Sequence, residues 1–549
     1  MNKKNIILIV VDAVRSYKSG RDERDRLDVY NELVDKGFFA FDKLVVSAPS
    51  SVMSSITMLT GLPSFMLARN YNDFKWEPDL YDVLPTNLSK KGYDCYGLFG
   101  TKEMRDKMKG VFPPIKTEFL SDGINVRQNK WSNKELFSVV KKCFEKSIHS
   151  NNTPFFMMAW FNSRFDPKTS LTISELMEYI EQKGYFDDSL VIVTADHGYP
   201  DQRRGLTSDG VDLKKAGIPH DLIVTDDNIC VPLAVRFPAA YEKSEKLLAQ
   251  FPNRLVSTVI SQESLAPTMC DVLDVRLDDK PIKPKRGEIL SEIENDSISP
   301  IRSDARFIFQ PNRITSVRSS LYKYVIDREA GQEFYYDLRS DPLEDQKLTS
   351  LNNHAHELKL LYEDTEREAL ELWIAKIENK LVDYNFIDML DEKEEFNVFF
   401  LGSTGFILPF LKHLDKYNYP INLYCINKHI EKNIRDINVN FCLVEGHSSS
   451  NAIVVLEDSL NNALVDQFKF IDVKKIRIID AHLNVTKSRR VLMLRSWINV
   501  ATGPFNRMFF RRELYQEDPA LLFSDILYIF KRSITLVVSK LLQAISGKN

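Results

Sequence analysis

The amino-acid sequence predicts an α/β protein, in which a doubly wound sheet is followed by a second, Rossmann-like α/β domain. Two observations support this fold class. In residues 1–200, short continuous apolar runs alternate with helical stretches, as in a parallel sheet with helices on both faces. A second alternation of the same kind begins at Asn397, after a long charged region. A chain of 549 residues has room for about two to four domains of ordinary size.

Four apolar runs in the N-terminal part predict buried strands. A strand that is covered on both faces needs apolar side chains on both, so it shows a continuous run rather than an alternation. The first run is Ile6–Val11, which is too short for a signal peptide and ends at Asp12 without a cleavage site. The others are Cys95–Phe99, Phe155–Trp160 and Leu190–Thr194, the last preceded by a predicted helix at Ser174–Lys183.

The second alternation predicts a C-terminal domain. A strand at Asn397–Leu401 is followed by a turn at Gly402–Gly405 and a helix at Phe406–Leu414. A turn with glycines before a helix can admit a phosphate. It is shorter than the GxGxxG fingerprint, so we favour a structural module over a nucleotide site. Further strands are predicted at Ile421–Ile426, Ala452–Leu456 and Lys475–Ile479.

We expect three parts along the chain: a catalytic domain at 1–350, a helical connector at 351–392 and the α/β domain at 393–549. The connector is predicted from the charged helical segments His354–Tyr362 and Asp364–Leu381. The last domain ends in a tail, Asp525–Ile545, that mixes apolar residues with lysine and arginine. This tail either packs on its own domain or is an amphipathic helix that contacts a membrane or a partner.

Composition excludes several classes of protein. The formal net charge of −4 argues against a general nucleic-acid binder. The six cysteines are far apart and form no CxxC pair, so we expect free thiols in a reducing compartment. No apolar stretch approaches the length of about 18 residues that a membrane span needs. We therefore expect a cytoplasmic protein, with the tail as the candidate contact to the inner face of the membrane. The oligomeric state is not predicted.

Three chain segments place polar residues where they can meet. Asp12 follows the first strand, Asp196 and His197 follow the strand Leu190–Thr194, and Ser51 stands in a serine-rich turn before an apolar helix. Active-site residues gather beyond the carboxyl ends of strands in such sheets. Two carboxylates and an imidazole are good ligands for a divalent cation, and a hydroxyl can fill a fourth position. A metal-bound hydroxyl is acidified and becomes a nucleophile.

Five segments resemble, in the same order, motifs of the sulfatase family within the alkaline phosphatase superfamily. They extend over about 350 residues, and each alone would be weak. They are the opening strand Asn5–Arg15, the segment Leu190–Gly198 with its Asp-His pair, the strand Val231–Pro238, the helix Leu265–Leu273, and the "Lys-Tyr … Tyr-Asp-Leu … Asp-Pro" signature in Val317–Tyr324 and Phe334–Pro342.

The resemblance implies an alkaline-phosphatase-like sheet with a small C-terminal subdomain of the sulfatase type. It also implies one divalent metal ion (Mn, Mg, Ca or Zn), held by Asp12, Ser51, Asp196 and His197. A two-metal site would need more histidines than the N-terminal part offers.

The family resemblance places the nucleophile at Ser51 rather than Ser47. Sulfatases carry Cys or Ser in a Cys/Ser-x-Pro-x-Arg motif, which is matured to formylglycine and is followed by Thr-Gly about ten residues later. Counting back from Gly61 gives Ser51, whereas Ser47 begins the superficially similar Ser47–Ser51. Neither position supplies the arginine, so we expect an unmodified serine, as in phosphotransferase relatives. A role of Ser51 as a helix N-cap only stays open.

Further residues are carried over from the family pattern. Lys168 in Asp166-Pro167-Lys168 stands where relatives often have a histidine, and could bind an ester oxygen. His220 stands before the strand at Val231, where relatives often place a substrate-binding or acid histidine. Arg203 follows the Asp-His pair and, with Asp166, is assigned to substrate binding. For Lys168, His220 and Arg203, an ordinary solvent-exposed role stays open.

These residues predict a metal-dependent, sulfatase-like hydrolase that acts on sulfate or phosphate esters through a covalent Ser51 intermediate. The expected substrate is an anionic ester on a surface glycan or a lipid-linked head group, and no nucleic acid is expected as a partner. Two alternatives stay open: a phosphotransferase that moves a phospho-head-group onto a glycan, and a non-catalytic scaffold in polysaccharide assembly.

Overall fold

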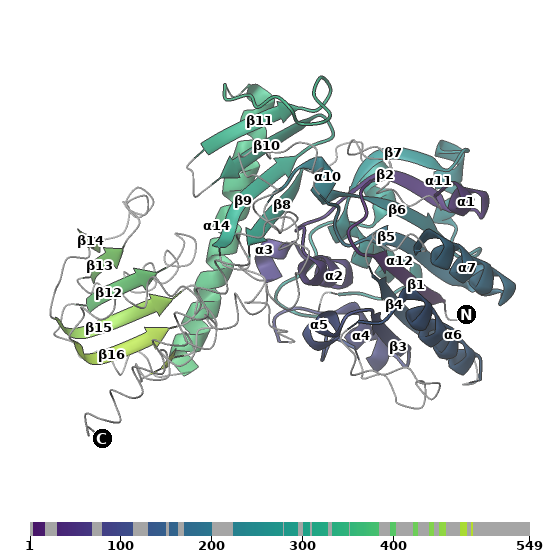
Figure 1. The fold of residues 1–549 in the computed structure, drawn as a ribbon, viewed down its shortest axis with the longest axis horizontal. Helices are drawn as coiled ribbons and strands as arrows, with labels where there is room; N and C mark the ends of the chain where they lie inside the picture. The colour runs from purple at the N-terminus through teal and green to yellow at the C-terminus, as the bar shows by residue number, and fades with distance from the viewer. Residues whose placement is uncertain are drawn as a thin grey trace, which may run out of the picture. The chain divides into compact units, whose positions relative to one another are not determined.

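The chain forms two compact units, Met1–Glu366 and Arg367–Asn549, each described here by itself (Figure 1). A computed structural model describes residues 4–16, 30–67, 79–112, 130–149, 153–162, 169–199, 223–277, 279–294, 300–307, 310–327, 332–350, 352–383, 396–401, 421–425, 439–443, 449–456, 473–479 and 485–486.

The first unit is built on a seven-stranded sheet with the order β3-β4-β1-β5-β6-β2-β7. Strand β6 runs antiparallel to both of its neighbours and the other pairs are parallel, so the sheet is mixed. All four predicted strands are confirmed, with ends shifted by one residue at most. The strands are β1 Asn5–Val11, β2 Phe39–Val45, β3 Asp94–Phe99, β4 Phe155–Phe161, β5 Ser189–Ala195, β6 Cys230–Arg236 and β7 Leu255–Ser261.

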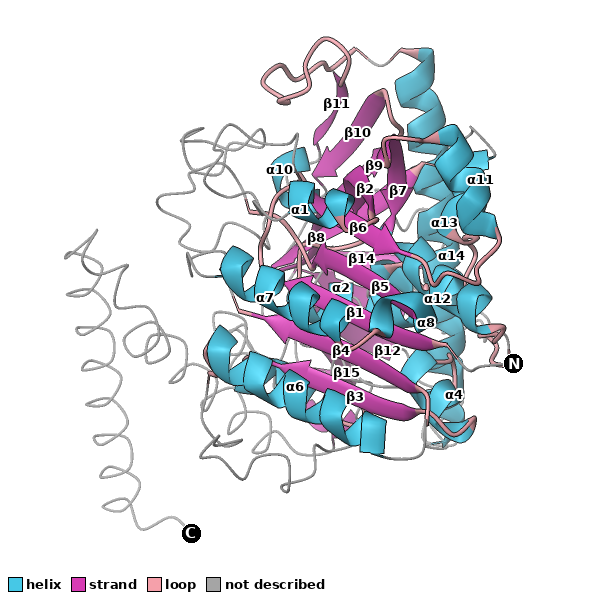
Figure 2. Ribbon diagram, turned by 90° about the vertical axis from the view of Figure 1, so that its right-hand side faces the viewer, coloured by secondary structure: helices cyan, strands magenta, loops and turns pink. Residues whose placement is uncertain are grey.

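Helices cover both faces of this sheet, which is why its central strands are apolar throughout. Helices α6 and α7 lie on one face, and α2 and α4 lie on the other (Figure 2). Helix α7 begins five residues before the predicted start at Ser174. The helices are α1 Tyr30–Asp35, α2 Ser51–Thr60, α3 Ser64–Leu67, α4 Leu84–Lys90, α5 Lys102–Lys107, α6 Asn133–His149, α7 Thr169–Gln182, α8 Tyr185–Asp188, α10 Asp226–Ile229, α11 Lys243–Gln250, α12 Leu265–Leu273 and α13 Ile289–Glu294, with a short 3-10 turn η6 at Gln262–Ser264.

Three strands end at the same edge of the sheet. In the parallel pair β1–β5, Val11 lies opposite Ala195, so both strands stop at the same level. Strand β2 is antiparallel to β6, which is antiparallel to β5, so β2 points the same way as β5. The segments that follow these strands, which carry Asp12, Asp196 and Ser51, therefore begin at one edge.

A second, four-stranded antiparallel sheet with the order β11-β10-β9-β8 completes the first unit. Its strands are β8 Ile301–Phe307, β9 Gln310–Arg318, β10 Tyr322–Asp327 and β11 Gln332–Asp337. The long helix α14, Asn353–Asp383, contains both predicted helical segments of the connector. Its residues Leu358 and Tyr362 pack against Val317, Tyr322 and Tyr324 of the sheet.

A buried charge cluster joins the small sheet to the large one. The carboxylate of Asp226, in α10, accepts hydrogen bonds from Arg318 Nη1 at 3.0 Å and Lys323 Nζ at 3.2 Å. Lys323 Nζ also pairs with Glu344 Oε1 at 2.5 Å, and Glu344 Oε2 accepts from the backbone N–H of Asp226 at 2.7 Å. Burial alone would raise the pKa of Asp226, but the charges of Arg318 and Lys323 lower it below its usual range.

The second unit contains a six-stranded sheet with the order β14-β13-β12-β15-β16-β17. In chain order this is 3-2-1-4-5-6, the order of dinucleotide-binding sheets. Its strands are β12 Phe396–Leu401, β13 Ile421–Cys425, β14 Val439–Leu443, β15 Ser449–Leu456, β16 Val473–Ile479 and β17 Val485–Thr486, of which only β17 pairs antiparallel.

The predicted strands of this second unit are confirmed, and β14 and β17 are additions. The turn at 402–405, the helix at 406–414 and the tail at 525–545 lie outside the described residues. The Rossmann-like assignment and the domain boundaries therefore stay predictions.

Two expectations from composition concern the state of the cysteines and the presence of membrane-spanning helices. The thiols of Cys95, Cys143, Cys230 and Cys270 are buried and are not joined in disulfides, as predicted for the cysteines in the described part of the chain. Among the helices that the structure describes, none combines the length and the apolar character that crossing a bilayer requires.

The charge cluster generates a stability prediction. Lys323→Met should lower the free energy of unfolding by about 3–5 kcal/mol, because the buried Glu344 then loses its cationic partner and Asp226 loses one of its cationic partners. The matched control is Lys243→Met, which removes a half-exposed lysine paired with Asp271 and Glu288 and should cost about 1 kcal/mol or less. Urea denaturation measures both, and equal losses in the two variants would contradict the prediction.

The packing of α14 generates a second prediction. A fragment of residues 1–390 should fold, because it keeps α14 and with it the apolar contacts of Leu358 and Tyr362. A fragment of residues 1–350 should melt at a lower temperature, because the same face of the small sheet is then exposed to water. Circular dichroism melting curves compare the two. An insoluble 1–390 fragment would show that the two units share a core.

Candidate metal centre

The carboxylate of Asp196 lies directly after β5 and is fully buried. Its Oδ1 accepts hydrogen bonds from the backbone N–H groups of Ala13 at 3.0 Å and His197 at 2.8 Å. Its Oδ2 accepts from the indole Nε1–H of Trp160 at 3.0 Å. All three partners are N–H donors, which is the environment that an anionic carboxylate needs when it is removed from water.

Ala13 donates to Asp196 from an unusual backbone conformation. Its φ is +55°, in the left-handed region that residues with a Cβ rarely adopt. This conformation turns the chain sharply after Asp12 and brings the Ala13 N–H to Asp196. A strained residue beside a group of ionisable side chains is typical of a functional site.

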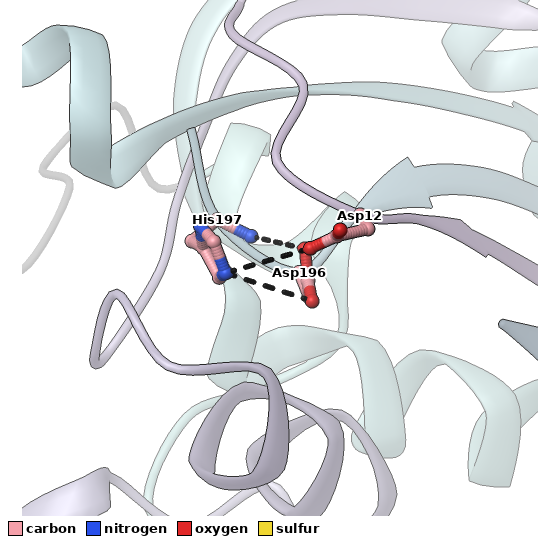
Figure 3. Close-up of side chains that lie close together, drawn as sticks. All are labelled: Asp12, Asp196 and His197. Carbon is pink, nitrogen blue, oxygen red and sulfur yellow. Dashed lines mark hydrogen bonds and ion pairs between the residues drawn. The ribbon is translucent and has the colours of Figure 1, made fainter. Parts of the chain in front are cut away.

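His197 is held in one tautomer by its own loop. Its Nδ1 lies 2.7 Å from the carbonyl oxygen of Gly198. A carbonyl oxygen only accepts, so Nδ1 carries the proton, and in the neutral ring the lone pair is on Nε2. That Nε2 lies 3.8 Å from Asp12 Oδ1 and 3.8 Å from Asp196 Oδ2 (Figure 3).

Three potential ligand atoms thus converge at one point, all within 4.8 Å of one another. They are one oxygen from each carboxylate, Asp12 and Asp196, and the ring nitrogen of His197. Lone pairs that face one another repel unless a positive charge lies between them, so the set fits a divalent cation. A doubly protonated imidazole would also satisfy the two carboxylates, and metal titration separates these two states.

Ser51 is the first residue of α2, and its Oγ lies 3.3 Å from His197 Nε2. The hydroxyl donates here, because Nε2 carries the lone pair. Helix α2 ends at Thr60, and Gly61 follows with a left-handed φ of +71° and donates its N–H to Thr57. The spacing that selected Ser51 in the sequence is therefore the length of α2, from its first residue to its glycine C-cap.

Ser47 is engaged elsewhere. Its Oγ accepts the backbone N–H of Ser64 at 2.6 Å, and its carbonyl oxygen accepts the Ser64 hydroxyl at 2.9 Å. Its side chain is buried in the turn between β2 and α2. The hydroxyl of Ser47 thus has a structural partner, whereas that of Ser51 faces the imidazole.

The loop after Asp196 is fixed by backbone contacts with α10. Gly198 N–H donates to the carbonyl of Asn228 at 2.8 Å, and Tyr199 N–H donates to that of Asp227 at 2.9 Å. A Cβ at Gly198 would lie 2.2 Å from the Asp227 oxygen, so only glycine fits this close approach. The neighbouring Asp226 belongs to the buried charge cluster, which anchors α10.

Of the eight predicted site residues, the structure brings together Asp12, Ser51, Asp196 and His197. The other four, Asp166, Lys168, Arg203 and His220, lie outside the described residues, so their roles stay predictions. Trp160 contacts the site and was not among the predicted residues. Its position at the end of the predicted strand Phe155–Trp160 was the available signal, because strand ends in such sheets border the site.

No protein-family model and no curated protein matches the chain. Solved structures are similar to it. An alkaline phosphatase superfamily protein from Vibrio parahaemolyticus is 14% identical over 65% of this chain and 84% of its own, with a TM-score of 0.47. A protein solved with its substrate D-glucosamine-2-N,6-O-disulfate is 12% identical over 67% and 98%, with a TM-score of 0.49. The phosphonate monoester hydrolase of Agrobacterium radiobacter is 14% identical over 67% and 95%, with a TM-score of 0.47.

The first of these structures is described as a member of the superfamily that the sequence motifs resemble. At these identities and TM-scores, the likeness concerns the fold and carries no information about activity or substrate. What the site can do has to follow from its own residues.

Proposed function

We propose that the chain is a metal-dependent enzyme that cleaves or transfers a sulfate or phosphate ester through Ser51. The observation that carries this proposal is the convergence of Asp12, Asp196 and His197 Nε2 at 3.8 Å, with the Ser51 hydroxyl 3.3 Å from the same nitrogen. Asp196 is buried and Asp12 is partly buried beside the imidazole of His197, and a cation between them would balance the two negative charges.

Asp12, Asp196 and His197 would hold the ion, with the Ser51 hydroxyl as a fourth ligand. When bound, the metal lowers the pKa of the serine hydroxyl and neutralises negative charge on the ester. The carboxylates supply hard oxygen ligands and the imidazole supplies nitrogen, a mixture that suits Zn and Mn and leaves Mg and Ca open.

The residues of the chain supply the nucleophile, the proton donor and the groups that bind the ester. The Ser51 hydroxyl loses its proton to solvent, and its Oγ forms a bond to the sulfur or phosphorus atom while the bond from that atom to the leaving alcohol breaks. The leaving oxygen takes up a proton, for which His220 is the predicted donor. The ester oxygens lie near the N-terminus of α2, whose first backbone N–H groups are not used inside the helix. Water then hydrolyses the Ser51 adduct, or an acceptor alcohol takes the group.

Several finer points belong to the same proposal. The missing arginine beside Ser51 supports an unmodified serine and favours a phosphate ester, whereas the sulfatase motifs favour sulfate. We propose an anionic ester on a glycan or a lipid-linked head group as the substrate, and a cytoplasmic enzyme with the C-terminal tail at the membrane.

Turnover of p-nitrophenyl phosphate, its phosphodiester and its sulfate by metal-loaded protein tests the reaction class. No turnover of any of the three, with metal bound, would favour the scaffold alternative.

The metal site should bind one ion per chain, since the residues that the structure describes form one ligand group. Asp196→Asn should abolish most metal binding, because a neutral amide is a poorer ligand for a cation than a carboxylate. The amide NH₂ would also face N–H groups that now donate hydrogen bonds to a carboxylate oxygen. The matched control is Asp188→Asn, an exposed residue before the other end of β5, which should bind metal normally. Metal analysis after dialysis measures both, and two tightly bound ions per chain would contradict the prediction.

Ser51→Ala should lower kcat/KM by about a thousandfold or more, which corresponds to about 4 kcal/mol of transition-state stabilisation. Ser47→Ala is the matched control. It removes the acceptor of the Ser64 N–H, so it should lower the melting temperature while leaving most of the activity. Peptide mapping by mass spectrometry should find an unmodified serine at position 51. Full activity in Ser51→Ala would refute the assignment, and an aldehyde at either serine would refute the unmodified nucleophile.

A further inference from the structure

Trp160 contacts the candidate metal centre from a strand that does not adjoin β5. It lies in β4, and β1 separates β4 from β5. In register, Trp160 lies opposite Val10, and Val10 lies opposite Thr194. Two strand spacings, about 10 Å, therefore separate the backbones of Trp160 and Thr194. Only a long side chain with a donor near its far end can cover most of this distance and reach Asp196.

The hydrogen bond between Trp160 and Asp196 satisfies the buried indole N–H as well as the buried carboxylate. Trp160 is 3% exposed and Asp196 is 0% exposed, so water satisfies neither group. The indole Nε1–H only donates, and a buried indole N–H usually finds an acceptor. Its acceptor is Asp196 Oδ2 at 3.0 Å.

The hydrogen bonds leave little of the Asp196 carboxylate for anything else. Its two oxygens offer about four lone-pair sites. On Oδ1, the N–H groups of Ala13 and His197 occupy two of them, and on Oδ2 the indole occupies one. The one that remains is on Oδ2, the oxygen that lies 3.8 Å from His197 Nε2.

The geometry points to Trp160 as a positioning residue of the metal centre: its indole N–H fixes the Asp196 carboxylate so that it offers one oxygen, Oδ2, to the ion. This inference rests on the proposed function, because it needs a cation at the site. With the indole N–H removed, only the two contacts on Oδ1 hold the group, and Oδ2 can turn away from the ion. Loss of such a contact to a ligand typically weakens metal binding about 10–100-fold.

Two substitutions at position 160 separate the hydrogen bond from the packing. Trp160→Phe removes the donor and part of the ring. Replacement of Trp160 by benzothienylalanine, in which sulfur stands in for the indole N–H, removes the donor and keeps the shape. The matched control is Trp131→Phe, since Trp131 is also buried and its ring packs against Arg105. The full-length protein is stripped with EDTA, dialysed and titrated by calorimetry with Zn²⁺, Mn²⁺, Mg²⁺ and Ca²⁺.

For the ion that the native protein binds most tightly, both replacements of Trp160 should raise Kd at least tenfold. Trp131→Phe should change Kd by less than about threefold, even if its melting temperature falls as far as that of Trp160→Phe. With a diamagnetic ion, the tryptophan emission of the native protein should change on binding, and this change should be lost in Trp160→Phe.

The other outcomes overturn the inference in distinguishable ways. If the native protein binds an ion and benzothienylalanine at position 160 leaves Kd unchanged, the indole N–H has no positioning role and the metal proposal stands. If Trp131→Phe weakens binding as much as Trp160→Phe does, the effect is one of packing. If the native protein binds none of the four ions, the metal proposal fails and this inference fails with it.

Discussion

The buried carboxylate of Asp196 is the constraint around which the large sheet is organised. Its hydrogen-bond donors come from the ends of three strands: Ala13 after β1, Trp160 in β4 and His197 after β5. An anion without such donors would be too costly to bury, so the strand ends have to meet at the same level. The same arrangement brings Asp12 and the imidazole of His197 to one point, where the proposed cation would balance two negative charges. The geometry of the site thus depends on one buried charge.

The central strands of the large sheet could be predicted from the sequence, whereas β2 and β7 near one edge of the sheet could not. β1, β3, β4 and β5 were predictable because strands that are covered on both faces are continuously apolar. The strands at Phe39–Val45 and Leu255–Ser261 were not predicted, since the first contains Asp42 and Lys43 and the second begins with an exposed Leu255. The antiparallel direction of β6 was also beyond the pattern, because apolar runs carry no information about strand direction.

The site was predictable to the extent that it consists of residues directly after strands. Asp12, Asp196 and His197 stand at strand ends, and Ser51 was located by its spacing to Gly61, which proves to be the length of α2. Trp160 was missed because its side chain counts as apolar in any pattern. Only the structure shows that its single polar atom meets Asp196 across β1. A hydropathy pattern does not distinguish a side chain that is mostly apolar but carries one polar atom, although that atom usually forms a hydrogen bond when it is buried.

The Lys-Tyr and Asp-Pro signature in the sequence helps to hold the loop that carries His197. Lys323 of the Lys-Tyr pair and Glu344, which follows Asp341-Pro342, bind each other and Asp226 in the buried charge cluster. Asp226 begins α10, whose next two carbonyl groups accept the N–H groups of Tyr199 and Gly198. In the described part of the chain, the small sheet acts on the site through α10, and the ligand group of Asp12, Asp196 and His197 comes from the large sheet. The small sheet holds the helix against which the loop of His197 is fixed, so motifs that are distant in the sequence support the Asp196-His197 pair at the end of β5.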